Sequence, residues 1–185
     1  SVCLMGSATI DLLAAGGDGD YNFYMLPDLV SPVLLPFEIQ PTTTSTYGFM
    51  VTDGCETPPA YLSSTVTVHE IPEIVLAAEP NAGCQPLTVQ FSDETQPTAI
   101  AWNWNFGDAG SNSNTMQSEQ GAHIYNGAGN YDVSLNITTA EGCYADTVLS
   151  NYVEVFATPT ADFEATEDKV SLLSSEIDFT DLSEG

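Results

Sequence analysis

Basic side chains are almost absent from this sequence. Its 185 residues contain a single Lys or Arg against 26 Asp and Glu, which gives a formal net charge of −25. Phosphate contacts to nucleic acid require clustered Lys and Arg, and so does attraction to an anionic membrane surface. No stretch approaches the roughly 18 apolar residues that a bilayer-spanning helix needs. We therefore expect no nucleic-acid partner and no direct membrane insertion.

Long helical periodicity is also missing. Apolar and polar residues alternate instead over residues 65–68, 87–91 and 131–137, and Gly-, Asp- and Pro-rich turn signals separate such runs. Alternation over short segments is typical of half-buried strands, and many short strands divided by turns favour a β-sandwich. In the first part of the chain we expect strands over residues 8–13, 21–25, 33–35, 45–52 and 61–68.

The sequence lacks the paired cysteine spacing of a zinc site. It contains four cysteines, none in a C-x-x-C pair or near a histidine at ligand spacing: Cys3, Cys55, Cys84 and Cys143. An even number favours two disulfides and hence an oxidising, extracellular compartment. Three connectivities are open from the count alone. The alternative is four free thiols in a cytosolic protein.

Motifs of common enzymes are missing as well. There is no Gly-x-Ser-x-Gly elbow and no phosphate-binding glycine loop. Pairs of carboxylates are frequent, but chance produces them in so acidic a chain, so they do not indicate a glycosidase. We expect no enzymatic activity and no catalytic residue.

An internal repeat divides the chain. Residues 89–95 (VQFSDET) align with residues 177–183 (IDFTDLS) at an offset of 88, and residues 72–78 align with residues 159–165 at an offset of 87. A period of this length fits a tandem array of sandwich domains. The predicted domains are residues 1–70, a sandwich expected to lack its first strand, residues 71–157, a full sandwich, and residues 158–185, an incomplete copy.

Four sequence blocks of the second domain resemble the PKD domain (polycystic kidney disease repeat). They are the segment from Pro86 to Asp93, the W-x-F-G-D block, an H-x-Y block and a G-x-Y-x-V-x-L block. Ala109 stands where the family usually has a glycine. The resemblance implies structural roles for the signature residues, which are Trp104, Phe106, Gly107, Asp108, His123, Tyr125, Gly129 and Tyr131.

The flanking segments resemble related modules. Residues 158–185 look like the start of another PKD repeat, with Leu172 where Cys84 would align, and residues 1–70 resemble immunoglobulin-like repeats that accompany PKD domains in Bacteroidetes surface proteins. The resemblance implies an all-β fold of tandem immunoglobulin-like, PKD-type sandwiches in a rod-like array. It also implies a bacterial cell-surface location and non-catalytic work.

The domain division selects one disulfide pairing. Each of the first two predicted domains contains two cysteines, so we expect Cys3–Cys55 and Cys84–Cys143, one bridge per domain. Closing loops of this length stabilises a fold by on the order of 4 kcal/mol in the chain-entropy model.

The aromatic residues of the signature strand have two interpretations. Trp102, Trp104 and Phe106 alternate, so they share one face of a strand. Exposed, they would form a platform on which sugars stack; buried, they belong to the sandwich core. The family resemblance favours the core for Trp104, and we expect the same for Trp102.

Calcium is the one cofactor that the carboxylates suggest. Asp18 and Asp20 lie in a Gly-Asp-Gly-Asp segment and Asp108 follows the signature glycine. Carboxylate oxygens suit Ca²⁺, but the spacing of an EF-hand is absent. The alternatives are a polar hairpin loop for the first two and a turn that accepts backbone N–H groups for Asp108.

These observations lead to one functional expectation and two alternatives. The resemblance implies a repeat segment of a secreted adhesin or filament protein, a spacer for adhesion or gliding motility exported by type IX secretion. The alternatives are an accessory module of a secreted hydrolase and a carbohydrate-binding module. Expected partners are neighbouring repeats, surface glycans and other surface proteins.

Overall fold

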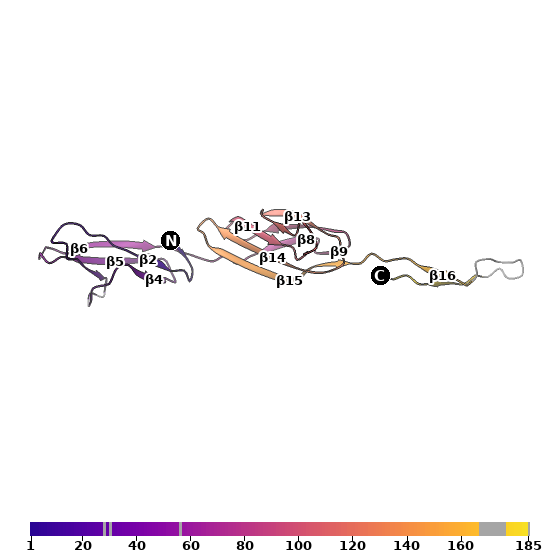
Figure 1. The fold of residues 1–185 in the computed structure, drawn as a ribbon, viewed down its shortest axis with the longest axis horizontal. Coiled ribbons are helices and arrows are strands. Elements are labelled where there is room, and N and C mark those ends of the chain that lie inside the picture. Colours follow the sequence, from indigo (N-terminus) through magenta and orange to yellow (C-terminus); the bar gives the residue numbers. More distant parts are fainter. Residues whose placement is uncertain (28, 30, 56, 167–176, 185) are drawn as a thin grey trace, which may run out of the picture. The chain divides into compact units, whose positions relative to one another are not determined.

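A computed structural model describes residues 1–27, 29, 31–55, 57–166 and 177–184 (Figure 1). Every element in this described part is a β-strand, so the predicted all-β class is confirmed. The described part holds no helix long and apolar enough to span a membrane. The chain packs as two compact units: Ser1–Glu73 with Thr95–Ile100 and Ile137–Ala145, and Ile74–Glu94 with Ala101–Asn136 and Asp146–Gly185. The predicted domain boundaries stay predictions.

The first sandwich is built from seven short strands. A two-stranded sheet pairs β2 with β4, a three-stranded sheet has the order β3-β5-β6, and β1 runs parallel to β7. The hairpin from β5 to β6 pairs Ser45 with Val66 and Val51 with Ala60. The strands are β1 (Val2–Cys3), β2 (Ala8–Ile10), β3 (Asn22–Met25), β4 (Phe37–Ile39), β5 (Ser45–Thr52), β6 (Ala60–Val66) and β7 (Val68–His69).

One strand expected in this region is wrong. Residues 33–35 are not a strand, and the strand lies instead at Phe37–Ile39, which pairs with Ile10–Ala8. Pro32 and Pro36 flank the expected segment and offer no N–H to a ladder, whereas the alternating residues after Pro36 are free to pair. The strand expected over residues 45–52 is confirmed as β5.

The second sandwich has two larger sheets. One has the order β13-β10-β8 and the other the order β12-β11-β14-β15-β9, in which β9 runs parallel to the end of β15. The strands are β8 (Leu76–Glu79), β9 (Ala82–Cys84), β10 (Leu87–Asp93), β11 (Ala99–Asn105), β12 (Thr115–Met116), β13 (Gln120–Tyr125), β14 (Gly129–Thr139) and β15 (Tyr144–Phe156).

The two sandwiches share one strand plan. The pair β2-β4 corresponds to β10-β13, the sheet β3-β5-β6 corresponds to β11-β14-β15, and the parallel pair β1-β7 corresponds to β9-β15. In residues 1–27, all of which are described, no strand corresponds to β8. The first and second sandwiches are therefore repeats of one topology, a relation that the sequence offsets of 87 and 88 did not include.

A pair of strands near the C-terminal end of the described chain repeats a register of the second sandwich. Strand β16 (Phe163–Ala165) pairs with β17 (Phe179–Asp181), and Ala165 faces Phe179. In the second sandwich Ala78 faces Phe91 in the same way. Ala78 and Ala165 are related by the sequence offset of 87, and Phe91 and Phe179 by the offset of 88. The strand pair β16–β17 therefore corresponds to β8 and β10.

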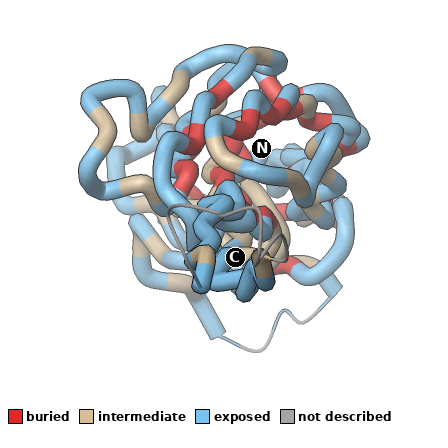
Figure 2. The backbone as a smooth tube through the Cα atoms, turned by 90° about the vertical axis from the view of Figure 1, so that its right-hand side faces the viewer, coloured by how far each residue is buried: buried red, intermediate tan, exposed pale blue. Residues whose placement is uncertain are grey.

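The core of the second sandwich is dense. Fourteen of its apolar residues are buried, and buried positions run along the strands in Figure 2. From Val133 to Thr139, strand β14 alternates between buried and half-buried positions. Trp104, Phe91 and Phe106 lie at the centre of this core, with the Phe91 and Phe106 rings 4.7 Å apart. Such alternation buries one face of each strand against the opposite sheet.

Candidate functional site

The signature aromatic residues form the interior of the second sandwich. Trp104 is 0% exposed, Phe106 1% and Tyr125 0%. The Phe106 ring stacks on the His123 imidazole at 4.8 Å, and the Tyr131 ring covers Tyr125 at 4.3 Å. Trp104, Phe106, His123 and Tyr125 are shut off from solvent and Tyr131 is half-buried over them, so this cluster is part of the core.

Polar groups inside this cluster are held by specific hydrogen bonds. Nε2 of His123 lies 3.0 Å from Oδ2 of Asp108, and the Tyr125 hydroxyl donates to the Phe106 carbonyl at 2.9 Å. Nδ1 of His123 is buried without a hydrogen-bond partner. Burial, with a smaller effect of the Asp108 charge, raises the pKa of Tyr125. These bonds link the W-x-F-G-D block to the H-x-Y block, and the sequence analysis did not predict them.

The turn that carries Asp108 has a backbone geometry that requires a glycine. Gly107 has φ 74°, and a Cβ there would collide with the backbone of Asp132. The backbone N–H of Asp108 donates to Oδ1 of Asn114 at 2.7 Å, and that of Gly107 donates to Asn105. The Asp108 carboxylate thus bonds His123 rather than the turn amides, which revises the turn role expected for it.

The aromatic row does not form a sugar platform. Trp104 and Phe106 are buried, as expected for core residues, so the row of three is not exposed. Trp102 is half-buried, and its indole N–H donates to Oδ2 of Asp93 at 2.8 Å. The expected core position of Trp102 is therefore only partly met.

Two carboxylates and a thiol gather at one end of the first sandwich. Ligand atoms of Asp18, Asp53 and Cys55 lie within 4.8 Å of one another. Backbone N–H groups of Asp20 and Gly54 donate to Oδ1 of Asp18, and these bonds lower its pKa. Of the three calcium candidates, only Asp18 belongs to this cluster. Because Ca²⁺ takes six to eight oxygen ligands, two carboxylates and a soft thiol are an incomplete set, and calcium binding stays a prediction.

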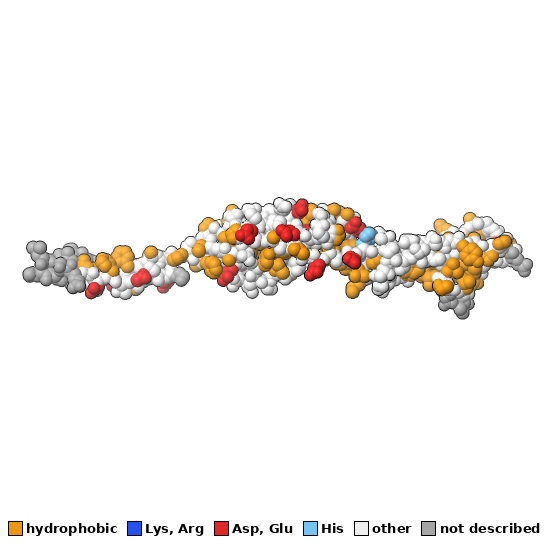
Figure 3. All heavy atoms as spheres, turned by 180° about the vertical axis from the view of Figure 1, so that it is seen from behind, with side chains coloured by type: hydrophobic (Ala, Val, Ile, Leu, Met, Phe, Trp, Pro, Cys, Tyr) orange, Lys and Arg blue, Asp and Glu red, His pale blue; other side chains and the backbone are white. Residues whose placement is uncertain are grey.

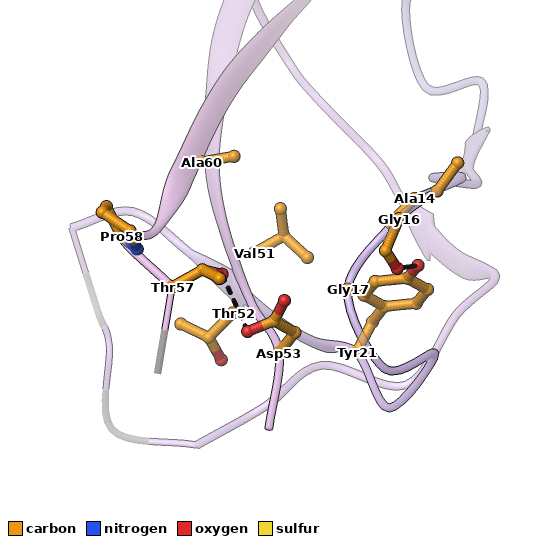
Figure 4. A pocket seen from close by; sticks show the side chains of 11 residues that line it. Ala14, Gly16, Gly17, Tyr21, Val51, Thr52, Asp53, Thr57, Pro58 and Ala60 are labelled. Atoms are coloured by element: carbon orange, nitrogen blue, oxygen red, sulfur yellow. Dashed lines mark hydrogen bonds between the residues drawn. The ribbon is translucent and has the colours of Figure 1, made fainter. Parts of the chain in front are cut away.

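A shallow pocket adjoins this cluster (Figure 4). Its volume is about 230 Å³, and Val51, Tyr21 and Pro58 provide apolar lining beside the Asp53 carboxylate. The Thr57 hydroxyl donates to Asp53 at 2.8 Å, and the Tyr21 hydroxyl donates to the Gly16 carbonyl. Pockets for drug-sized ligands usually enclose roughly 300–1,000 Å³. The polar groups of this pocket are used in bonds within the loop.

The expected disulfide pairing is wrong. Cys3 is bonded to Cys143, across 140 residues of sequence, and both lie in the first compact unit. Cys55 and Cys84 are free and exposed. The disulfide is typical of proteins that fold in an oxidising compartment.

Strand positions explain why the expected pairs do not form. Cys84 pairs in register with Phe156, at the end of β15, whereas Cys143 directly precedes the start of that strand. Thirteen strand residues span about 40 Å, while bonded cysteines need Cα atoms about 5.5 Å apart. Cys3 and Cys55 are likewise placed at opposite ends of the β6–β7 segment. The sequence analysis could not see this separation, because it assigned domains but not which end of a domain each cysteine occupies.

The carboxylates of the second sandwich are spread out on the face that Figure 3 shows. In Figure 3, acidic side chains of the second sandwich lie apart from one another among polar and apolar groups. No residue of the described ranges is a Lys or Arg, so the charge has no basic counterpart there. Like charges without basic partners repel one another across such a face.

Comparison with known proteins agrees with this geometry. Residues 69–155 match the family model described as PKD domain. No curated protein sequence matches the chain.

Three solved structures illustrate the range of similar folds. The PKD1 domain of Vibrio anguillarum Epp is 23% identical, with 45% of this chain and 94% of that chain covered and a TM-score of 0.36. The I67–I69 fragment of the titin I-band is 13% identical over 95% and 78% of the two chains, with a TM-score of 0.45. A structure of carbohydrate-binding modules of the β-sandwich superfamily is 16% identical over 58% and 52%, with a TM-score of 0.41. Residues 69–155 thus resemble a PKD domain in sequence and fold as a two-sheet, immunoglobulin-like sandwich.

Proposed function

We propose that this chain is a non-catalytic repeat segment of a large secreted cell-surface protein, an adhesin or filament, in which it acts as an extracellular spacer. The observation that carries the proposal is structural repetition: two sandwiches share one topology, and the strand pair β16–β17 repeats the β8–β10 register of the second sandwich. A PKD/immunoglobulin-like fold and a disulfide both fit an extracellular module.

The chemistry of the interior supports a spacer over an enzyme. The histidine and the aspartate of the signature bond each other inside the core, with the His123 side chain 0% exposed. A general base must reach its substrate, and this pair does not. The same packing supports a spacer over a sugar-binding module, because the aromatic row is turned inward.

A replacement experiment tests the spacer role. In the cells that make the native protein, residues 1–157 are exchanged for two unrelated immunoglobulin-like sandwiches of equal length, and adhesion and gliding are measured. A spacer should tolerate the exchange, whereas deletion of the same residues should shorten the reach and reduce adhesion. Loss of adhesion on exchange, with normal surface display, would contradict the proposal and favour a direct binding role.

The mass of the native polypeptide separates the remaining alternative. A long repeat array should have many times the mass of a single domain, and a single domain is on the order of 100–150 residues long. A chain of only a few domains that includes a catalytic one would instead make this segment an accessory module of a secreted hydrolase.

A further inference from the structure

Two cysteines have no partner within the described part of the chain. Cys55 and Cys84 are both free and exposed, in a protein that also contains the Cys3–Cys143 disulfide. Each of the four cysteines lies at an end of a sandwich, and their positions fall into two structural types.

The first type is a strand cysteine. Cys3 ends β1 and pairs in parallel register with His69, and the N–H of the next residue, Leu4, donates to the His69 carbonyl at 2.8 Å. Cys84 ends β9 and pairs in parallel register with Phe156, and the N–H of Gln85 donates to the Phe156 carbonyl at 2.9 Å. Each cysteine ends a short strand, pairs in parallel register and is followed by the same backbone hydrogen bond. Cys84 is therefore the structural equivalent of Cys3.

The second type is a turn cysteine. Cys143 follows Glu141-Gly142 in the turn from β14 to β15. Cys55 follows Asp53-Gly54 in the turn from β5 to β6, which is the equivalent hairpin, at a sequence offset of 88. Cys55 is therefore the structural equivalent of Cys143.

The existing disulfide shows which types pair. It joins the strand cysteine of the first sandwich to the turn cysteine of the sandwich that follows it in the chain. The two types lie at opposite ends of the last strand of each sandwich, so one sandwich can join both neighbours but cannot close a bridge within itself. Each junction then uses one cysteine of each type.

We propose that Cys84 forms a disulfide with a turn cysteine of the sandwich that follows, and that Cys55 forms one with a strand cysteine of the sandwich that precedes. The Cys3–Cys143 bond is then one member of a series of covalent links between consecutive repeats. The inference rests on the proposed function, because it requires neighbouring sandwiches in the same polypeptide. Leu172 occupies the aligned position of the strand cysteine in the next repeat, so that repeat would end the series on its C-terminal side.

The chemistry of each link is ordinary thiol oxidation. Two thiols lose two protons and two electrons as the S–S bond forms, and a protein or small-molecule disulfide of the oxidising compartment accepts them and is reduced to two thiols. No group of this chain needs to supply the oxidant.

Disulfide mapping of the native protein tests the proposal. The protein is alkylated while denatured but not reduced, and is cut after glutamate, because a single Lys or Arg leaves trypsin little to cut. The bond between Glu79 and Pro80 resists cleavage, so the four cysteines fall in separate peptides, residues 1–38, 39–56, 74–94 and 142–154. The link between peptides 1–38 and 142–154 serves as the internal control.

Two results support the proposal. Peptide 74–94 should be linked to a peptide with a Gly-Cys turn from the following repeat, and peptide 39–56 to a peptide from the preceding one. In addition, Cys84→Ser in the native chain should free a single thiol, that of the turn cysteine in the following repeat. In the same way, Cys3→Ser should free the thiol of Cys143. Alkylated Cys55 and Cys84, a link between the two, or a link to a second copy or another protein would overturn the proposal.

The same digest distinguishes failure of the proposed disulfide series from failure of the proposed spacer function. Free cysteines in a chain whose peptides include further sandwiches would overturn the covalent series and leave the spacer role standing. A chain without further sandwiches would overturn both.

Discussion

The two sandwiches share a strand plan but differ sharply in how much they bury. In β14, Val133, Leu135, Ile137 and Thr139 are all buried. In β5 the positions 88 residues earlier are Ser45, Tyr47, Phe49 and Val51, and of these only Phe49 is buried.

The difference extends through both domains. In the described part of the first sandwich, the buried apolar side chains other than prolines are Ile10, Phe49 and Val66, against fourteen in the second. Hydrogen-bonded topology can therefore be the same where side-chain burial is not. Because burial supplies most of the favourable free energy of folding, we expect the first sandwich to be the weaker of the two.

The largest expected effect comes from the matched core positions Phe49 and Ile137. Truncation of either to Ala should cost about 3–5 kcal/mol for Phe and about 2–5 kcal/mol for Ile. Phe49→Ala should unfold the first sandwich at 25 °C, since Phe49 contacts Phe37 in a core with few other members. Ile137→Ala should leave the second sandwich folded with a lower melting temperature.

Hydrogen exchange of the hairpins β5–β6 and β14–β15 measures this difference. Tyr61→Ala, at a position that is 66% exposed, is the control and should change stability by less than about 0.5 kcal/mol. Equal loss of protection in both hairpins for both variants would break the comparison.

The next effect concerns the two strand cysteines. Cys3→Ser removes the bond to Cys143 and should cost about 2–4 kcal/mol, because the unfolded chain is no longer closed over 140 residues. Cys84→Ser is its structural match in the second sandwich and should stay within about 0.5 kcal/mol in the 185-residue chain, where that thiol is free. Urea unfolding of both variants at equal concentration gives the two values. A loss for Cys84→Ser as large as that for Cys3→Ser would show that Cys84 already has a partner in this chain.

A third effect tests the polar network found only in the second sandwich. Asp108→Ala leaves Nε2 of the buried His123 without its partner and should cost about 1.5–3 kcal/mol. Asp108→Asn keeps an oxygen at that position and should recover more than half of the loss. Thermal unfolding followed by tryptophan fluorescence reports on this sandwich, because both tryptophans lie in it. Identical losses for the two variants would assign the effect to the turn and not to the bond.

Much of this arrangement could be predicted from the sequence, since alternation and motif order are local signals. Strand β5 was placed with its correct bounds, and the offset between Phe91 and Phe179 correctly indicated a repeated ladder. The all-β class and the burial of Trp104 follow from the same kind of pattern.

The contacts that depend on three dimensions could not be predicted in this way. Which end of a sandwich a cysteine occupies depends on two parallel pairings, that of β1 with β7 and that of β9 with β15. Strands β1 and β9 have only two and three residues, so they give no periodic signal in the sequence. The bond from His123 to Asp108 joins β13 to the turn after β11, which belongs to the other sheet, and the proximity of Asp18 to Asp53 depends on loop conformation. Spacing in the sequence contains no information about these distances.

The smallest effect at neutral pH belongs to Tyr125, and it should become visible through its pH dependence. Tyr125→Phe removes the bond to the Phe106 carbonyl and should cost about 1 kcal/mol at pH 8. The pKa of Tyr125 is raised in the folded state, mainly by burial. A raised pKa stabilises the fold below the unfolded value of about 10, and this contribution is lost as the pH rises above it.

The wild-type protein should therefore lose stability above pH 10 faster than Tyr125→Phe, by up to about 1.4 kcal/mol per pH unit for one proton. Urea midpoints at pH 8 and pH 11, with free thiols alkylated beforehand, measure this slope. Tyr61→Phe on the exposed face of β6 is the matched control and should run parallel to the wild type. If the gap between wild type and Tyr125→Phe is the same at both pH values, the hydroxyl is not held in the dense interior, and the contrast between the two sandwiches would be weaker than their burial indicates.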